Sequence, residues 1–243
     1  FIGALKLAAL WLPKRYFALF SGLATAFGVI GAVSADTILS RLVVSIGWRS
    51  SVYITAIAGF IIAALIFLVV RDKPSWVTRM PKSYHSWKHT WKRVFELLKM
   101  WRFWINGIVG ACLFMPVSVF ASLWGVAFLI GSYHLSATES ATAASLVFIG
   151  AAVGSPIAGW FSDLIQNRRL LLFIGTLATT GLSLVLIYIS GLSPITVLIL
   201  LFLIGVFAGP QILVFAIARE ISPPRSTGIS TASTNFIVTL INF

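Results

Sequence analysis

Apolar residues occupy the chain in long runs, and short polar stretches separate one run from the next. Most of these runs approach or exceed the roughly 20 residues that an α-helix needs to cross a bilayer. The pattern predicts complete spans at about 17–42, 51–70, 103–130, 141–162, 170–189 and 194–218, and partial spans at 1–12 and from 226 onward. Because the chain begins and ends inside apolar runs, we expect it to be a fragment of a longer membrane protein.

The composition excludes a soluble domain. Only 10% of the residues are charged and the mean hydropathy is +1.00, whereas a soluble domain carries about 25% charged residues. The net charge of +12 does not indicate a nucleic-acid partner, because the bases lie between the apolar runs. Counted from the start, the odd-numbered connections hold 15 of the 18 lysines and arginines, which predicts that these connections face the cytoplasm.

A polar stretch at 71–102 divides the spans into two groups. We predict that 1–70 is part of an N-terminal helix bundle, 71–102 a cytoplasmic connector, and 103–243 most of a C-terminal bundle. A weak internal repeat that relates 12–25 to 222–235 supports two similar halves. In the connector, apolar residues recur at helical spacing between basic ones, which predicts an amphipathic helix in the inner headgroup region, with protein binding as the alternative. The apolar positions are Trp87, Trp91, Val94, Phe95 and Leu98, and the basic ones are Lys88, Lys92, Arg93 and Lys99.

One stretch, GSPIAGWFSDLIQNRR at 154–169, combines small residues, an acid and two arginines at the end of an apolar run. Gly154 and Gly159 leave space for another helix to approach. Asp163 can accept bonds from the free N–H groups at the start of a neighbouring helix, and it can pair with a guanidinium of Arg168 or Arg169. A plain stop signal at the end of a membrane helix would have the same residues, and this stretch alone does not separate the two interpretations.

The stretch 154–169 resembles the loop signature of the major facilitator superfamily, G-x-x-x-[GD]-x-x-[SA]-D-x-x-x-[RK]-[RK]. Pro13-x-Arg15 and Gly47-Trp48-Arg49 resemble the family's turns between helices four and five and before helix six. The resemblance covers the whole chain, from within helix four to within helix eleven, and leaves helices one to three and twelve outside it. It implies an all-α membrane protein with a major-facilitator-type bundle in two halves, incomplete in this chain. The implied function is secondary active transport of a small polar solute by alternating access, without enzymatic activity or cofactor.

Several alternatives stay open at this stage. Two segments, at 3–32 and 122–129, look like bacterial permeases of the sugar-phosphate and organic-anion kind, so we expect a multi-pass protein of the bacterial inner (plasma) membrane. A drug exporter of the same fold is disfavoured, because Ala35-Asp36 stands where its signature has Gly-Pro. A transporter-like sensor or receptor is the second alternative. A coupling proton or other ion would be bound outside the visible spans, which have no acid at mid-membrane depth.

Four residues are candidate substrate contacts because the resemblance places them on cavity-lining helices. Lys6 could neutralise an anionic solute or extend its ammonium group to the membrane surface. Gln211 follows Gly209-Pro210, where the proline frees a backbone carbonyl. Asn235 and Trp124 have packing and interfacial roles as alternatives. The gate is assigned to Gly154, Gly159, Asp163, Arg168 and Arg169, with the acid contacting the start of helix eleven at 226–228. The histidines are too scattered to predict a metal site, and no nucleotide-binding loop is present.

Overall fold

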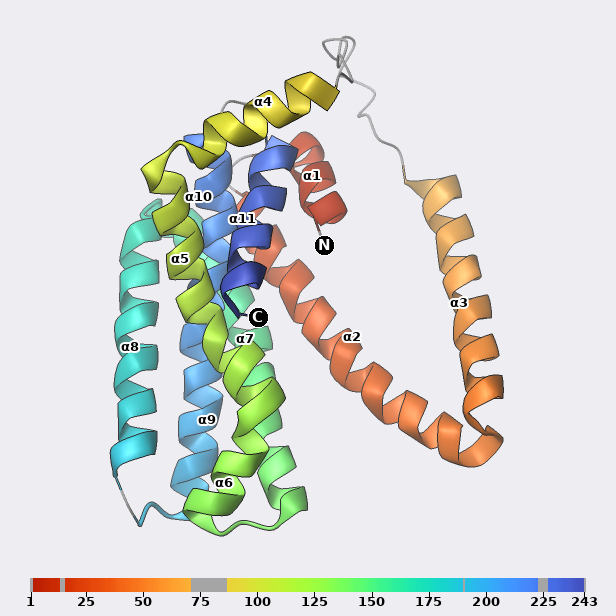
Figure 1. The fold of residues 1–243 in the computed structure, drawn as a ribbon, viewed down its shortest axis with the longest axis vertical. Coiled ribbons are helices and arrows are strands. Elements are labelled where there is room, and N and C mark those ends of the chain that lie inside the picture. The colour runs from red at the N-terminus through yellow and green to blue at the C-terminus, as the bar shows by residue number, and fades with distance from the viewer. Residues whose placement is uncertain (1, 14–15, 71–86, 190, 223–226, 243) are drawn as a thin grey trace.

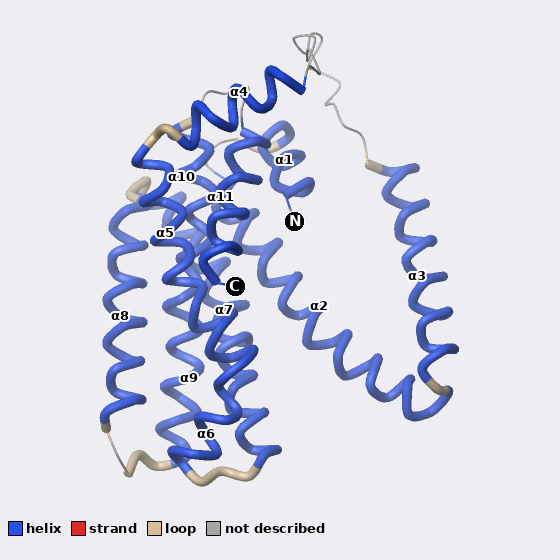
Figure 2. Tube along the Cα trace, viewed as in Figure 1, coloured by secondary structure: helices blue, strands red, loops and turns tan. Residues whose placement is uncertain are grey.

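The structure is a computed structural model that describes residues 2–13, 16–70, 87–189, 191–222 and 227–242, except for the side chains at 32–37, 40, 87–90 and 227. The described residues form helices joined by short connections (Figures 1 and 2). The helices are α1 (Ile2–Trp11), α2 (Phe17–Ile46), α3 (Trp48–Val69), α4 (Trp87–Leu98), α5 (Trp101–Met115), the π-helical η2 (Pro116–Trp124), α6 (Gly125–Tyr133), α7 (Ala137–Ile165), α8 (Arg168–Tyr188), α9 (Pro194–Ala208), the 3-10 turn η3 (Gly209–Ile212), α10 (Leu213–Ile221) and α11 (Thr227–Asn242).

Every predicted span is helical, and among the described residues five helical segments are long and apolar enough to cross a membrane. Two of them are composite: α5, η2 and α6 form one segment of 33 residues, and α9, η3 and α10 form one of 28. Several helices extend beyond the predicted ends of their spans. At α7, for example, Ser136 and Glu139 form a reciprocal capping box, which begins the helix before the hydropathy rises.

The spans run alternately up and down (Figure 1). The ends of α1, α3, α7 and α10 and the starts of α2, α5, α8 and α11 point to the same end of the molecule, where Arg168, Arg169 and Arg219 are located. We call this the basic end. The turns from α2 to α3, α6 to α7 and α8 to α9 lie at the opposite end. The alternation that the charge pattern predicted is therefore present in the fold.

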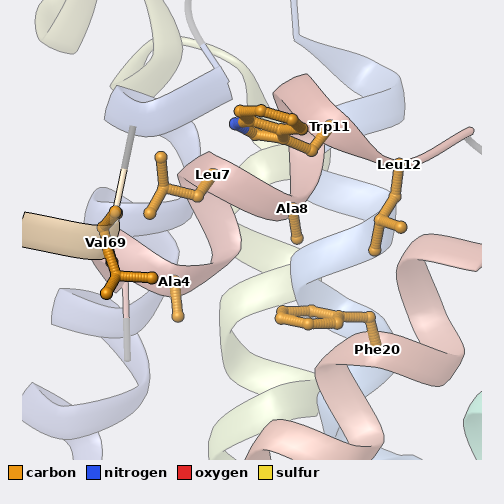
Figure 3. Close-up of a pocket in the computed structure, with 8 residues that line it drawn as sticks. Ala4, Leu7, Ala8, Trp11, Leu12, Phe20 and Val69 are labelled. Atoms are coloured by element: carbon orange, nitrogen blue, oxygen red, sulfur yellow. The ribbon is translucent and has the colours of Figure 1, made fainter. Parts of the chain in front are cut away.

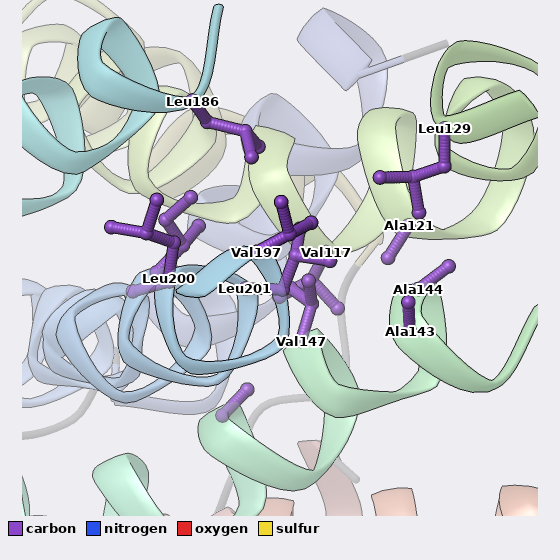
Figure 4. Packing of buried hydrophobic residues seen from close by; sticks show 13 residues of the cluster. Val117, Ala121, Leu129, Ala143, Ala144, Val147, Leu186, Val197, Leu200 and Leu201 are labelled. Carbon is purple, nitrogen blue, oxygen red and sulfur yellow. The ribbon is translucent and has the colours of Figure 1, made fainter. Parts of the chain in front are cut away.

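The main body packs around α7 and α9, and glycines bring these two helices together. A Cβ atom added to Gly150 or Gly154 would collide with the α9 backbone, and one added to Gly205 or Gly209 would collide with α7. Small residues at four-residue spacing, on α7 and across the junction of α9 with η3, allow this close approach. Toward the opposite end, the interface continues into an apolar cluster that includes residues of η2, α6 and α8 (Figure 4).

The first two helices join this body only at the basic end. Leu5, Phe17 and Ala18 are buried in a cluster with residues of α5, α8 and α10. Among the α2 residues whose side chains are described, the last buried one is Ala26. The helix diverges from the body until it turns into α3, which stands apart (Figure 1). The contact between α2 and α7 is thus confined to one end of the molecule.

Candidate functional site

The start of α2 lies directly on the last third of α7. A Cβ atom on Gly159 would collide with the Ala18 carbonyl, and one on Gly22 would collide with the backbone at Ser155. Both glycines are needed for the two backbones to come this close. A larger side chain at either position would push α2 away from α7.

Asp163 connects the same two helices by hydrogen bonds. Its Oδ2 atom accepts the backbone N–H of Leu19 at 2.9 Å, and its Oδ1 atom lies 3.3 Å from the Arg168 guanidinium. The prediction that Asp163 accepts from the start of a neighbouring helix is consistent with this geometry, but the predicted helix was wrong. The acceptor faces α2, not α11. The start of α11 instead lies against α1, where Gly228 faces the Lys6 side chain, and Ser226 is outside the described residues.

Arg168 holds Asp163 in place and extends the polar cluster. Its guanidinium donates to Glu220 at 2.6 Å, to Ser162 at 3.2 Å and to Asp163 at 3.3 Å. The Asp163 and Arg168 side chains are 7% and 11% exposed, whereas Glu220 is 55% exposed. Arg169, the next residue, is exposed and forms no ion pair within the described part of the chain.

The two predicted gate glycines do not act together. Gly159 faces α2, but Gly154 faces Val206 of α9 inside the main body. The expectation that both admit the same helix is therefore wrong. Five residues on an α-helix turn through about 140°, so positions 154 and 159 point to different neighbours.

Arg219, at the end of α10, is a second link to the first two helices. In the sequence it is only one of the 15 basic residues that predict the topology. It donates to the Ala9 carbonyl of α1 at 3.1 Å, and its guanidinium lies 4.5 Å from the centre of the Phe17 ring. A cation over an aromatic face is attracted by the ring quadrupole. No pattern in the sequence distinguishes this arginine from one that faces headgroups.

Gln211 lies deep in the body, on the 3-10 turn that Gly209 and Pro210 impose between α9 and α10. Its side chain is 9% exposed, and its amide makes no hydrogen bond to another described residue. The predicted proline break is thus present. An interhelical hydrogen bond of Gln211, the alternative to a solute contact, is not formed among these residues.

Among the described residues, no hydrogen bond or ion pair links Gln211 to the other three candidate solute residues. Lys6 is exposed beside Gly228, Asn235 is half-buried in α11, and Trp124 is exposed at the end of η2. An apolar pocket of about 450 Å³ lies between α1, α2 and the end of α3, and none of the four lines it (Figure 3).

Two amides that no sequence pattern indicated, the buried Asn106 and the half-buried Asn242, join α5 to its neighbours. The Asn242 amide donates to the Ala111 carbonyl at 3.2 Å and accepts from Ser118, while Asn106 donates to the Val214 carbonyl at 2.9 Å. Ser118 lies in η2, and π-helical segments occur frequently at functional sites. Among the residues described, no cluster of histidine, cysteine and acidic side chains could hold a metal ion.

Comparison with known proteins identifies the family of this chain. A search of curated proteins found no match. The family model described as Major Facilitator Superfamily matches residues 1–243, the full length of the sequence. This match confirms the resemblance noted from the sequence and the class of fold, while leaving the branch undetermined. The chain belongs to the Major Facilitator Superfamily, a family of membrane transporters.

Proposed function

We propose that this protein is a secondary active transporter that moves a small polar solute by alternating access, and that the α2–α7 contact is its gate at the basic end. In this conformation the gate is closed. Alternating access requires a contact between the two helix groups that holds one side shut and can be broken by differential solute binding of a few kcal/mol. The Asp163–Leu19 hydrogen bond, supported by Arg168, has that size, since a bond to a charged group contributes about 1.5–3 kcal/mol.

The observation that carries the proposal is the position of this bond. It joins α7 to the first turn of α2, where α2 is buried, while the rest of α2 diverges from the body (Figure 1). A purely structural bond would be expected along a continuous interface. A bond at the one end where α2 and α7 touch can break and re-form as the two helices separate and approach.

The solute site is proposed around Gln211, with Lys6 contributing if the solute is an organic anion. The support is a buried amide with unused donors and an acceptor next to a proline-broken helix. Asn235 and Trp124 remain candidates on neighbouring segments. Coupling to a proton or another ion is part of the proposal for the protein as a whole, as is a location in a bacterial inner membrane.

Two pairs of spin labels in the reconstituted protein test this function. One pair, at Leu10 and Leu170, reports across the basic end, and the other, at Ile38 and Tyr188, reports across the opposite end; all four side chains are exposed. Alternating access predicts two populations in which one distance is long when the other is short. If the two distances vary independently, or if both stay single-valued under every condition, the proposal is wrong.

A further inference from the structure

Helix α4 lies across the basic end of the body, beside the starts of α5 and α11 (Figure 1). Leu97 is 3% exposed, and Leu98 and Met100 pack against a small cluster formed by Phe103, Ala218 and Ile237. The Trp104 indole N–H donates to the Leu98 carbonyl at 2.7 Å, which fixes the corner between α4 and α5. The helix is therefore anchored to the bundle along one side.

The exposed side of α4 is aromatic beside this anchor and basic farther around the helix. Trp91 and Phe95 are 53% and 59% exposed, and their ring centres are 6.3 Å apart. Lys92 and Lys99 are also exposed, and neither forms an ion pair with a described residue. At 100° per residue, these lysines lie about 60° and 40° from Phe95, on the side away from Trp91. The exposed surface thus changes from aromatic to basic around the helix.

We propose that this surface, formed by Trp91, Phe95 and Lys92 of α4 and by Lys99 directly after the helix, binds the headgroup region of a leaflet containing anionic lipid. Helices of this type lie in the interface with their aromatic side in the acyl boundary and their lysines toward anionic headgroups. The arrangement continues onto the start of α5, where Trp101 is exposed and the Arg102 guanidinium lies 5.9 Å from its ring centre.

The order of residues around the helix favours lipid over a protein partner. An apolar groove on a protein would bind the two rings but would not require lysines beside them. An anionic leaflet binds both, because its acyl boundary accepts the rings and its headgroups attract the lysines. Aromatic side chains are also enriched at the depth where spans enter the bilayer, and Trp101, at the start of α5, is at that depth. Each lysine near an anionic surface increases partitioning roughly fivefold.

Depth measurements on the reconstituted protein test the membrane contact. A spin label at Phe95 is compared with a label at the adjacent Glu96, in a variant in which Cys112 is replaced by serine. Position 95 should be more accessible to oxygen than to a water-soluble nickel complex, and position 96 should show the reverse. Position 95 accessible mainly to the nickel complex would overturn the proposal and leave the surface for a protein partner.

The lipid preference is measured separately, by quenching of a fluorophore at position 95 with phosphatidylglycerol or phosphatidylcholine that carries a quencher. The anionic quencher should be enriched severalfold, and the double change Lys92→Gln and Lys99→Gln should return the ratio close to one. The double change Arg41→Gln and Arg49→Gln is the control, because it removes an equal charge near the turn from α2 to α3 at the opposite end. Equal quenching by both lipids, or no change in the double variant, would overturn the assignment to anionic lipid.

Discussion

Asp163→Asn isolates the part of the polar cluster that spans the gate. Of the bonds in this cluster, the one from Leu19 joins α2 to α7, whereas those of Arg168 stay within α7, α8 and α10. The Arg168 bonds therefore contribute equally to the closed and open gate. Asparagine keeps one acceptor oxygen for the Leu19 N–H but loses the charge, which changes a bond of about 1.5–3 kcal/mol into one of about 0.5–1.5.

The difference of about 1–1.5 kcal/mol should shift the population of the open basic end by roughly 5- to 10-fold. Distances between spin labels at Leu10 and Leu170, measured in the reconstituted protein, report that population. Turnover should fall more than solute affinity, because the solute site is untouched. The shift should be visible without solute, since the bond is a property of the closed conformation.

Glu220→Gln is the matched control. It also removes one carboxylate charge next to Arg168, but Glu220 is 55% exposed and its bond joins α8 to α10 within the body. Exposed ion pairs contribute little, and this one does not span the gate. The label distances should therefore stay as in the wild type. If both variants give the wild-type distribution, Asp163 only caps its turn, and the reasoning about the gate is refuted.

Three further predictions follow from the same contacts. Gly159→Ala should open the basic end because its Cβ would collide with the Ala18 carbonyl of α2. Gly154→Ala should instead lower the free energy of unfolding by about 1–3 kcal/mol because its Cβ would collide with α9. Equal effects of the two variants on the label distances would contradict these separate roles. Gln211→Leu should weaken solute binding at near-normal expression, and failure of the variant to insert would show that the amide is structural. Single cysteines at Lys99 and His134 should be labelled from opposite sides of the membrane, so labelling from the same side would refute the assigned topology.

The sequence was sufficient for the spans, their alternation and the location of the polar cluster, because hydrophobic run length and loop charge act locally along the chain. It did not reveal which helix Asp163 contacts. The contact depends on how α1, α2 and α11 pack at the basic end. There Gly228 of α11 faces the Lys6 side chain of α1, and the Leu19 N–H of α2 donates to Asp163.

The separate roles of Gly154 and Gly159 were missed for a related reason. A motif read as a string does not show that its glycines point to different sides of the helix. Arg219 was missed because its partners are a backbone carbonyl and a ring on other helices, neither of which leaves a pattern near position 219. The π-helical η2 was also not predicted. Pro116 indicates that the helix is kinked, but it does not indicate that the following turns are π-helical.

Solute counterflow in vesicles that contain the protein is the decisive test of transport by alternating access. Vesicles preloaded with one of a panel of unlabelled small organic anions, phosphorylated ones included, are diluted into labelled solute, so that exchange through the carrier requires no coupling ion. Alternating access predicts a transient accumulation of label for at least one solute, reduced in Asp163→Asn and retained in Glu220→Gln. Saturable binding without any movement of label across the membrane would contradict it and identify the protein as a sensor built on a transporter fold.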